Sequence, residues 1–151
     1  MYTFKSLIAV ALMMLTIAGG STLAFGKECH DMGGTAMAQA LSETEFVVAT
    51  EGDFGGGGYA KVLTKPEKIN DTQSKMGLRH YFITPGGSYV FTQDQVVLTH
   101  LKGERFYGET VYDVVASGGE FEGMRGSFKS AGVFDFTAGT VVVRFEGEIC
   151  R

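Results

Sequence analysis

The sequence predicts an all-β protein, an eight-stranded antiparallel β-barrel with a short helical or irregular segment before it. Three observations support this fold class. From Thr44 onward the chain is a series of short apolar or alternating runs. Glycines or polar residues separate these runs, and no long stretch has the spacing of an amphipathic helix. Many short strands in succession are typical of an antiparallel barrel or sandwich.

The first 26 residues have the pattern of a signal peptide. Lys5 precedes an apolar run at 7–20, and the small residues Ala24 and Gly26 suit cleavage after Gly26. The run is too short for a comfortable membrane span of roughly 20 residues. We therefore expect a single domain over 27–151, with no stable membrane anchor after cleavage, in a secreted or periplasmic location.

The two cysteines, Cys29 and Cys150, lie near the two ends of this domain. Outside the cytosol, an even pair most simply forms a disulfide. The alternative is half of a metal site at Cys29-His30-Asp31, but no histidine lies beside Cys150. The prediction is a disulfide, with no metal and no cofactor.

The net charge argues against a nucleic-acid partner. The formal charge of the whole chain is −4, and removal of Lys5 with the signal peptide makes it more negative. The chain has no basic run that would bind a phosphate backbone. In a eukaryotic source, Asn70-Asp71-Thr72 would be an acceptor for N-glycosylation.

The elements follow from local pattern. Residues 31–41 are expected to form one or two helical turns, and 65–77 a polar loop. Strands rich in Val, Phe, Tyr and Thr are expected at 45–50, 59–63, 79–84, 88–92, 95–101, 107–116, 126–136 and 140–150.

The last two strands have the clearest alternation. Over 140–150, Val141, Val143 and Phe145 alternate with charged residues, and a similar pattern runs over 126–136. A period of two places each apolar set on the inner face of a sheet. The glycine in the connection at 136–139 suits a tight hairpin.

The glycine-rich stretch at 117–128 is predicted to turn the chain. A phosphate-binding loop leads into a helix, whose N-terminal amides meet the anion. Here an extended run enters the glycines and another leaves them, and Glu120 and Glu122 would repel an anion. The same reasoning applies to the glycines at 51–61.

This C-terminal region resembles a known family. The resemblance rests on a sequence pattern: an apolar strand, then Gly118-Gly119, Phe121, Gly123, Arg125-Gly126 and two closing strands. It is similar to the C-terminal portion of the allene oxide cyclase and dirigent barrel superfamily. The resemblance implies an eight-stranded barrel with a hydrophobic cavity, often in a homo-oligomer. Cyclases of this family steer ring closure of a fatty-acid epoxide, and dirigent proteins orient phenoxy radicals.

Candidate ligand-binding residues come mainly from the strand at 107–116. Thr110 and Tyr112 alternate with Glu109, and we expect the first two to face the interior. Glu109 would form a site if the faces were reversed. Further candidates are Tyr81, with Tyr89 and Phe91 as other aromatic residues, and the two strand histidines, His80 and His100. The open alternative is a barrel filled by its own side chains.

No catalytic residue is predicted, because the chain has no Gly-x-Ser-x-Gly elbow and no histidine-rich metal motif. The leading hypothesis is an exported barrel that binds a small hydrophobic molecule or acts as a non-enzymatic interaction module. The second is a cyclase-like isomerase or dirigent-like catalyst, which needs an enclosed cavity with a buried polar group. The third is a structural, homo-oligomeric envelope protein with no such cavity.

Overall fold

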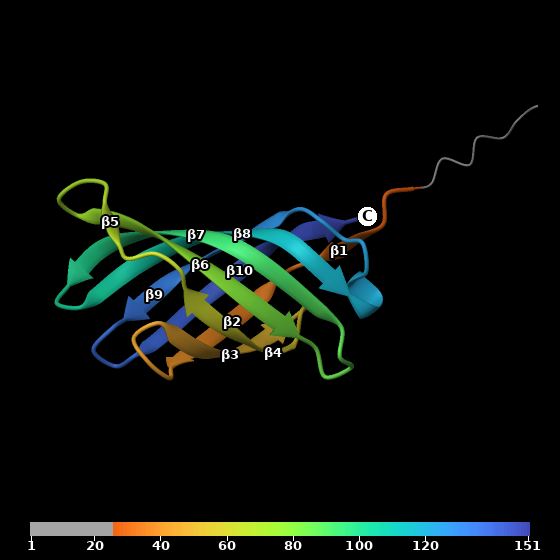
Figure 1. The fold of residues 1–151 in the computed structure, drawn as a ribbon, viewed down its shortest axis with the longest axis horizontal. Coiled ribbons are helices and arrows are strands. Elements are labelled where there is room, and N and C mark those ends of the chain that lie inside the picture. Colours follow the sequence, from red (N-terminus) through yellow and green to blue (C-terminus); the bar gives the residue numbers. More distant parts are fainter. Residues whose placement is uncertain (1–25) are drawn as a thin grey trace, which may run out of the picture.

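The computed structural model describes residues 26–151, so the predicted signal peptide lies outside the described residues except for Gly26. Eight antiparallel strands form a closed barrel, which confirms the predicted fold class (Figure 1). They are β2 (Gly34–Ala40), β3 (Glu45–Gly52), β4 (Gly56–Val62), β6 (Gln73–Ile83), β7 (Tyr89–Lys102), β8 (Arg105–Gly118), β9 (Ser127–Asp135) and β10 (Thr140–Cys150). Strand β10 closes the ring because it pairs with both β9 and β2.

Three short elements lie outside this ring. Strand β1 (Cys29–Asp31) extends the pairing of β10, and β5 (Glu67–Lys68) pairs with β6. The 3-10 helix η1 (Gly119–Phe121) follows β8 inside the glycine-rich stretch, where Gly119 adopts φ +69°. A left-handed backbone of this kind favours glycine, so the stretch turns the chain as expected. Among residues 26–151, no helix is long and apolar enough to span a membrane.

The sequence prediction was wrong in three elements. Residues 34–40 form strand β2 and not helical turns, because this segment is the partner that joins β3 to β10. The two strands expected at 88–92 and 95–101 are one strand, β7. The polar segment at 65–77 contains β5 and the first residues of β6. Long-range pairing overrides local composition in all three cases.

The alternation in the last two strands is confirmed. Val143, Phe145 and Ile149 of β10 are buried, and so are Phe128 and Phe134 of β9. The intervening charged residues of β10 are exposed. These inward side chains belong to one continuous hydrophobic core inside the barrel.

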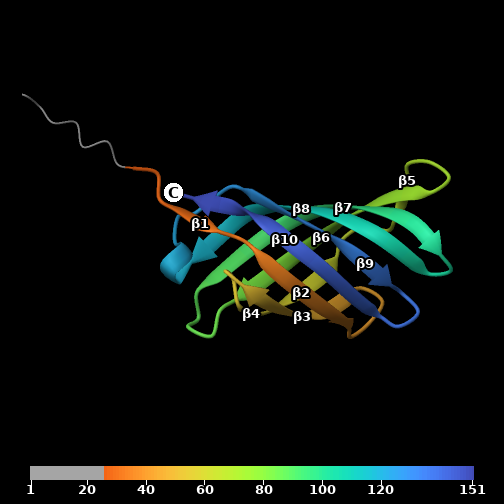
Figure 2. The same ribbon diagram turned by 180° about the vertical axis from the view of Figure 1, so that it is seen from behind.

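The two ends of the barrel differ. One end holds β1, η1 and the C-terminus, and the other holds β5 with the β7–β8 and β9–β10 turns (Figure 2). At the first end, Met32, Phe54 and Phe121 are almost completely buried, with the Phe54 and Phe121 ring centroids 5.3 Å apart. The predicted disulfide between Cys29 and Cys150 is present there and joins β1 to the end of β10. We call this the closed end, and the opposite one the open end.

Candidate functional site

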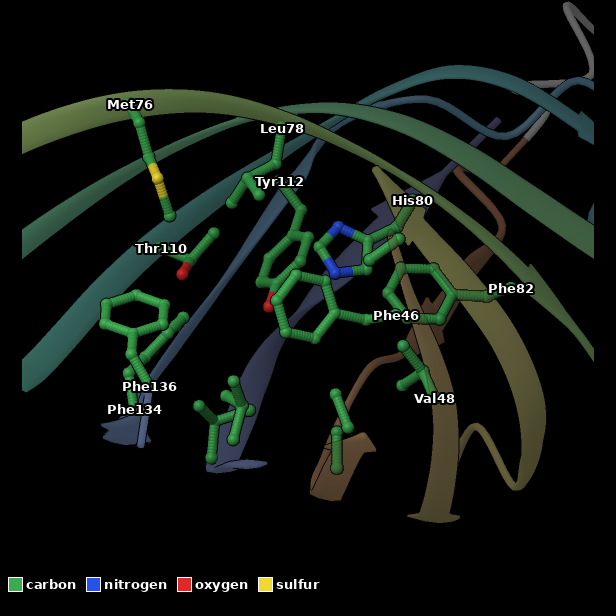
Figure 3. Close-up of a pocket in the computed structure, with 15 residues that line it drawn as sticks. Phe46, Val48, Met76, Leu78, His80, Phe82, Thr110, Tyr112, Phe134 and Phe136 are labelled. Atoms are coloured by element: carbon green, nitrogen blue, oxygen red, sulfur yellow. The ribbon is translucent and has the colours of Figure 1, made fainter. Parts of the chain in front are cut away.

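The open half of the barrel contains a cavity of about 50 Å³, and Figure 3 shows the 15 side chains that line it. Most of the wall is apolar, including Phe46, Phe82 and Phe134. Nearer the closed end, a second void of about 10 Å³ is lined by residues that include Met32 and Phe54. Side chains of the described residues therefore fill most of the barrel, and the larger apolar space that remains is the cavity in its open half.

Small side chains on β2 and β4, which lie on either side of β3, contribute to this space. The inward positions of β2 and β4 include Ala36, Ala38 and Ala60, and all three line the cavity. Phe136, just beyond β9, lies at the rim, because it lines the cavity and yet is 37% exposed.

Only three lining residues carry nitrogen or oxygen atoms in their side chains: His80 of β6 and Thr110 and Tyr112 of β8. The Tyr112 hydroxyl is hydrogen-bonded to the Ser130 hydroxyl of β9 at 2.9 Å. Burial raises the pKa of Tyr112 to about 12. At neutral pH this phenol therefore keeps its proton, and Tyr112 has a proton to donate when Ser130 is the donor in their shared bond.

His80 forms a buried pair with Asp94 of β7. The distance from His80 Nδ1 to Asp94 Oδ2 is 2.7 Å, and the Asp94 side chain is 0% exposed. Asp94 is not a lining residue, so it lies behind His80 as seen from the cavity. Its second oxygen, Oδ1, has no hydrogen-bond partner within residues 26–151. A buried carboxylate needs pairing, so the imidazole stabilises Asp94 while Asp94 fixes the imidazole.

Aromatic contacts fix the orientation of the His80 ring. It stacks on Phe82 at a centroid distance of 5.0 Å and an interplanar angle of 4°, and meets Tyr112 edge-on at 5.2 Å. Because Nδ1 is bonded to Asp94, Nε2 is the ring nitrogen that takes no part in this pair. The cavity thus combines an apolar wall, a held imidazole and a phenol that is protonated at neutral pH.

The structure places three of the candidates named from the sequence at this cavity, namely His80, Thr110 and Tyr112. Thr110 and Tyr112 are buried and line it, in the predicted orientation. Ligand binding by either residue stays a prediction. Glu109 alternates with them and lies on the outer face of β8, which follows from the period of two.

Tyr81 does not line the cavity, contrary to our expectation. It alternates with His80 and Phe82, so it points outward and is 38% exposed. There it stacks against Tyr89, with ring centroids 5.8 Å apart, and it also contacts Phe91. Aromatic composition alone did not distinguish the two faces of the strand.

His100 also lies outside the cavity. It shares the inward phase of β7, but it is exposed near the end of the strand, where the β7–β8 hairpin extends toward its turn (Figure 1). Its Nε2 is hydrogen-bonded to the carbonyl oxygen of Gly103 at 2.8 Å. The predicted glycosylation acceptor, Asn70, is likewise exposed, in the turn between β5 and β6.

Sequence reasoning did not identify Asp94. The available signal was its phase: in a single strand over 89–102, Asp94 alternates with Val90, Thr92 and Val96 and so shares their buried face. Division of this strand into 88–92 and 95–101 left Asp94 in a supposed turn. An acid in the apolar phase of a long strand was the feature to notice.

Comparison with known proteins adds no assignment to this site. The chain matches no protein-family model, no curated protein and no solved structure. The function proposed below therefore rests on the residues of the barrel.

Proposed function

We propose that the protein binds a small, mostly apolar molecule in the open half of the barrel. The supporting observation is an apolar cavity that reaches the rim at Phe136 and carries polar groups at only three positions. Apolar walls provide most of the affinity in such a site, and a few polar groups orient the guest. His80 and Tyr112 would be these orienting groups.

The size of the cavity limits the guest. A buried water needs about 10–15 Å³ on the same measure, so a cavity of about 50 Å³ has space for roughly three to five waters. The enclosed part of the guest therefore has only a few non-hydrogen atoms. A longer molecule would extend past Phe136 into solvent.

Native mass spectrometry tests this proposal. The protein is purified without detergent, its mass is measured under native conditions, and bound molecules are then extracted into organic solvent. We expect a reproducible lipophilic adduct. Ala38→Phe should fill the cavity and remove the adduct, whereas Ala49→Phe should retain it, because Ala49 is exposed on the outer face of β3. An equal adduct in both variants, or none in the wild type, would contradict the proposal.

An extracytoplasmic location is part of the same proposal. A disulfide persists in oxidising compartments. The Cys29–Cys150 bond lies at the closed end of the barrel, where Cys29 is exposed to solvent. The apolar run at 7–20 supports export. Mass spectrometry of the protein isolated from its native cells should find Lys27 as the first residue. A chain that begins at Met1 would contradict processing.

A steering catalyst of the cyclase or dirigent kind is the second candidate function. It is favoured by the buried His80–Asp94 pair at the cavity wall, since a pure binding site for an apolar molecule has no need of a buried ionisable pair.

A further inference from the structure

We propose that His80 and Asp94 are an acid–base pair that moves a proton on a ketone held in the cavity. This inference rests on the binding function proposed above and adds a reaction to it. His80 would be the catalytic residue, since it lines the cavity, and Asp94 a positioning residue behind it.

The geometry of the pair is that of a general base. A buried carboxylate at Nδ1 holds the imidazole in one tautomer and stabilises the imidazolium that forms when Nε2 accepts a proton. The 2.7 Å contact supplies this arrangement, and the flat stacking on Phe82 prevents the ring from turning away. Nε2 is therefore held in a fixed direction, while Nδ1 is used by Asp94.

The other lining groups restrict the kind of reaction. No lysine or cysteine is among the residues that line the cavity, so the lining offers no amine or thiol nucleophile. The wall is apolar and the volume is small, which disfavours hydrolysis by a pool of water. Transfer of a proton between two atoms of the same guest needs neither a nucleophilic side chain nor free water.

Tyr112 identifies the substrate class. Its ring centroid lies 5.2 Å from that of His80, so a base and a hydroxyl donor face the same small space. A carbonyl group next to an acidic C–H bond presents the matching pair, an acceptor oxygen and a removable proton. Ser130 can donate to the Tyr112 oxygen, which leaves the Tyr112 proton for the carbonyl oxygen.

The reaction is a double-bond shift in a β,γ-unsaturated ketone. His80 Nε2 removes the proton from the carbon between the carbonyl and the double bond. The electron pair of that C–H bond forms a dienolate, and its oxygen accepts the hydrogen bond from Tyr112. The imidazolium then returns the proton to the far carbon of the former double bond. The product is the conjugated isomer, so atoms and electrons balance without a cofactor.

Cyclopent-3-enone is a suitable probe because it has only six non-hydrogen atoms. Its conversion to cyclopent-2-enone is followed by the ultraviolet absorbance of the conjugated enone. We expect the wild-type protein to accelerate the conversion. The double variant His80→Gln/Asp94→Asn should lower kcat on the order of 100-fold or more. This double variant removes the base and the buried charge together. Because the two amide side chains can still hydrogen-bond to each other, the contact between positions 80 and 94 is kept and the fold is protected.

Two single variants and a control refine the assignment. Tyr112→Phe should lower kcat on the order of 100-fold, as loss of an oxyanion donor does. Asp94→Asn should lower kcat with KM unchanged, which a merely structural role would not do. His100→Gln is the matched control, since His100 is exposed outside the cavity, and it should leave the rate unchanged.

The outcomes separate the two proposals. Binding of the probe is measured independently from NMR shifts of the Val141 and Val143 methyl groups, which line the cavity. If these methyls shift but the wild type is no faster than the double variant, proton transfer is refuted and ligand binding stands. If no methyl shifts and no conversion occurs, both proposals fail for this class of guest.

Discussion

Removal of the Cys29–Cys150 disulfide should lower the stability of the barrel strongly without changing its fold. The two cysteines are 121 residues apart, so the bond closes almost the whole described chain into one loop. In the chain-entropy model, a loop of this length removes about 16 cal/mol/K from the unfolded state, or about 4.9 kcal/mol at 25 °C. The double variant Cys29→Ser/Cys150→Ser should lose an amount of this order.

The folded state should tolerate this change, because other contacts also hold the chain around Cys29 and Cys150 together. Cys150 and Arg125 exchange two backbone hydrogen bonds, each of 2.8 Å. Arg151 forms an ion pair with Glu28 at 2.8 Å, and the Arg151 amide donates to the Glu28 carbonyl oxygen. The effect of the disulfide therefore acts mainly through the unfolded chain.

The assay is differential scanning calorimetry of the wild type and the double variant. A domain of this size has an unfolding entropy of roughly 0.26 kcal/mol/K, so the predicted loss corresponds to a fall in Tm of about 19 °C. Near-UV circular dichroism below the transition should be unchanged. Reductant should reproduce the fall in the wild type and have no effect on the double variant. A fall in Tm of less than about 4 °C would refute the loop-entropy argument.

Three further predictions concern the interior. The pKa of Tyr112, about 12, lies above its ordinary value of 10.0, so the stability that the protonated phenol contributes is complete below pH 10, and about 3 kcal/mol of it is lost as the pH rises through 12. The free energy of unfolding is measured by urea denaturation at pH 9 and pH 11. Tyr112→Phe should lose less stability between these two pH values than the wild type, and an identical loss in both proteins would contradict the raised pKa of Tyr112. Phe54→Ala at the closed end should lower the free energy of unfolding by about 3–5 kcal/mol, because Phe54 is almost completely buried. Phe136→Ala at the exposed rim should lower it by less than about 1 kcal/mol in the same urea assay. Equal losses would show that the two ends do not differ in packing. Gly132→Ala should cost about 1–3 kcal/mol because its methyl group would overlap the backbone of β10, while Gly57→Ala, whose nearest neighbour would lie at 3.4 Å, should cost less than about 1 kcal/mol. Similar chemical-denaturation midpoints for the two glycine variants would contradict that packing.

Several features were predictable because they depend on short-range pattern. The alternation in β10 and β9 identified the inner face, and the same reasoning placed Thr110 and Tyr112 inside and Glu109 outside on β8. The disulfide followed from the number and position of the cysteines. In each case a period of two or a simple count carries the information, so no knowledge of distant neighbours is needed.

The tertiary structure alone decided what the barrel contains. Strand β2 has a composition that also suits a helix, and only its pairing with β3 and β10 makes it a strand. That pairing turns Ala36 and Ala38 inward and so leaves space for the cavity. His80 and Asp94 are 14 positions apart on different strands, and their contact depends on the register of β6 against β7. Register is set by the whole closed sheet, which is why the sequence determined the barrel and the tertiary structure determined its site.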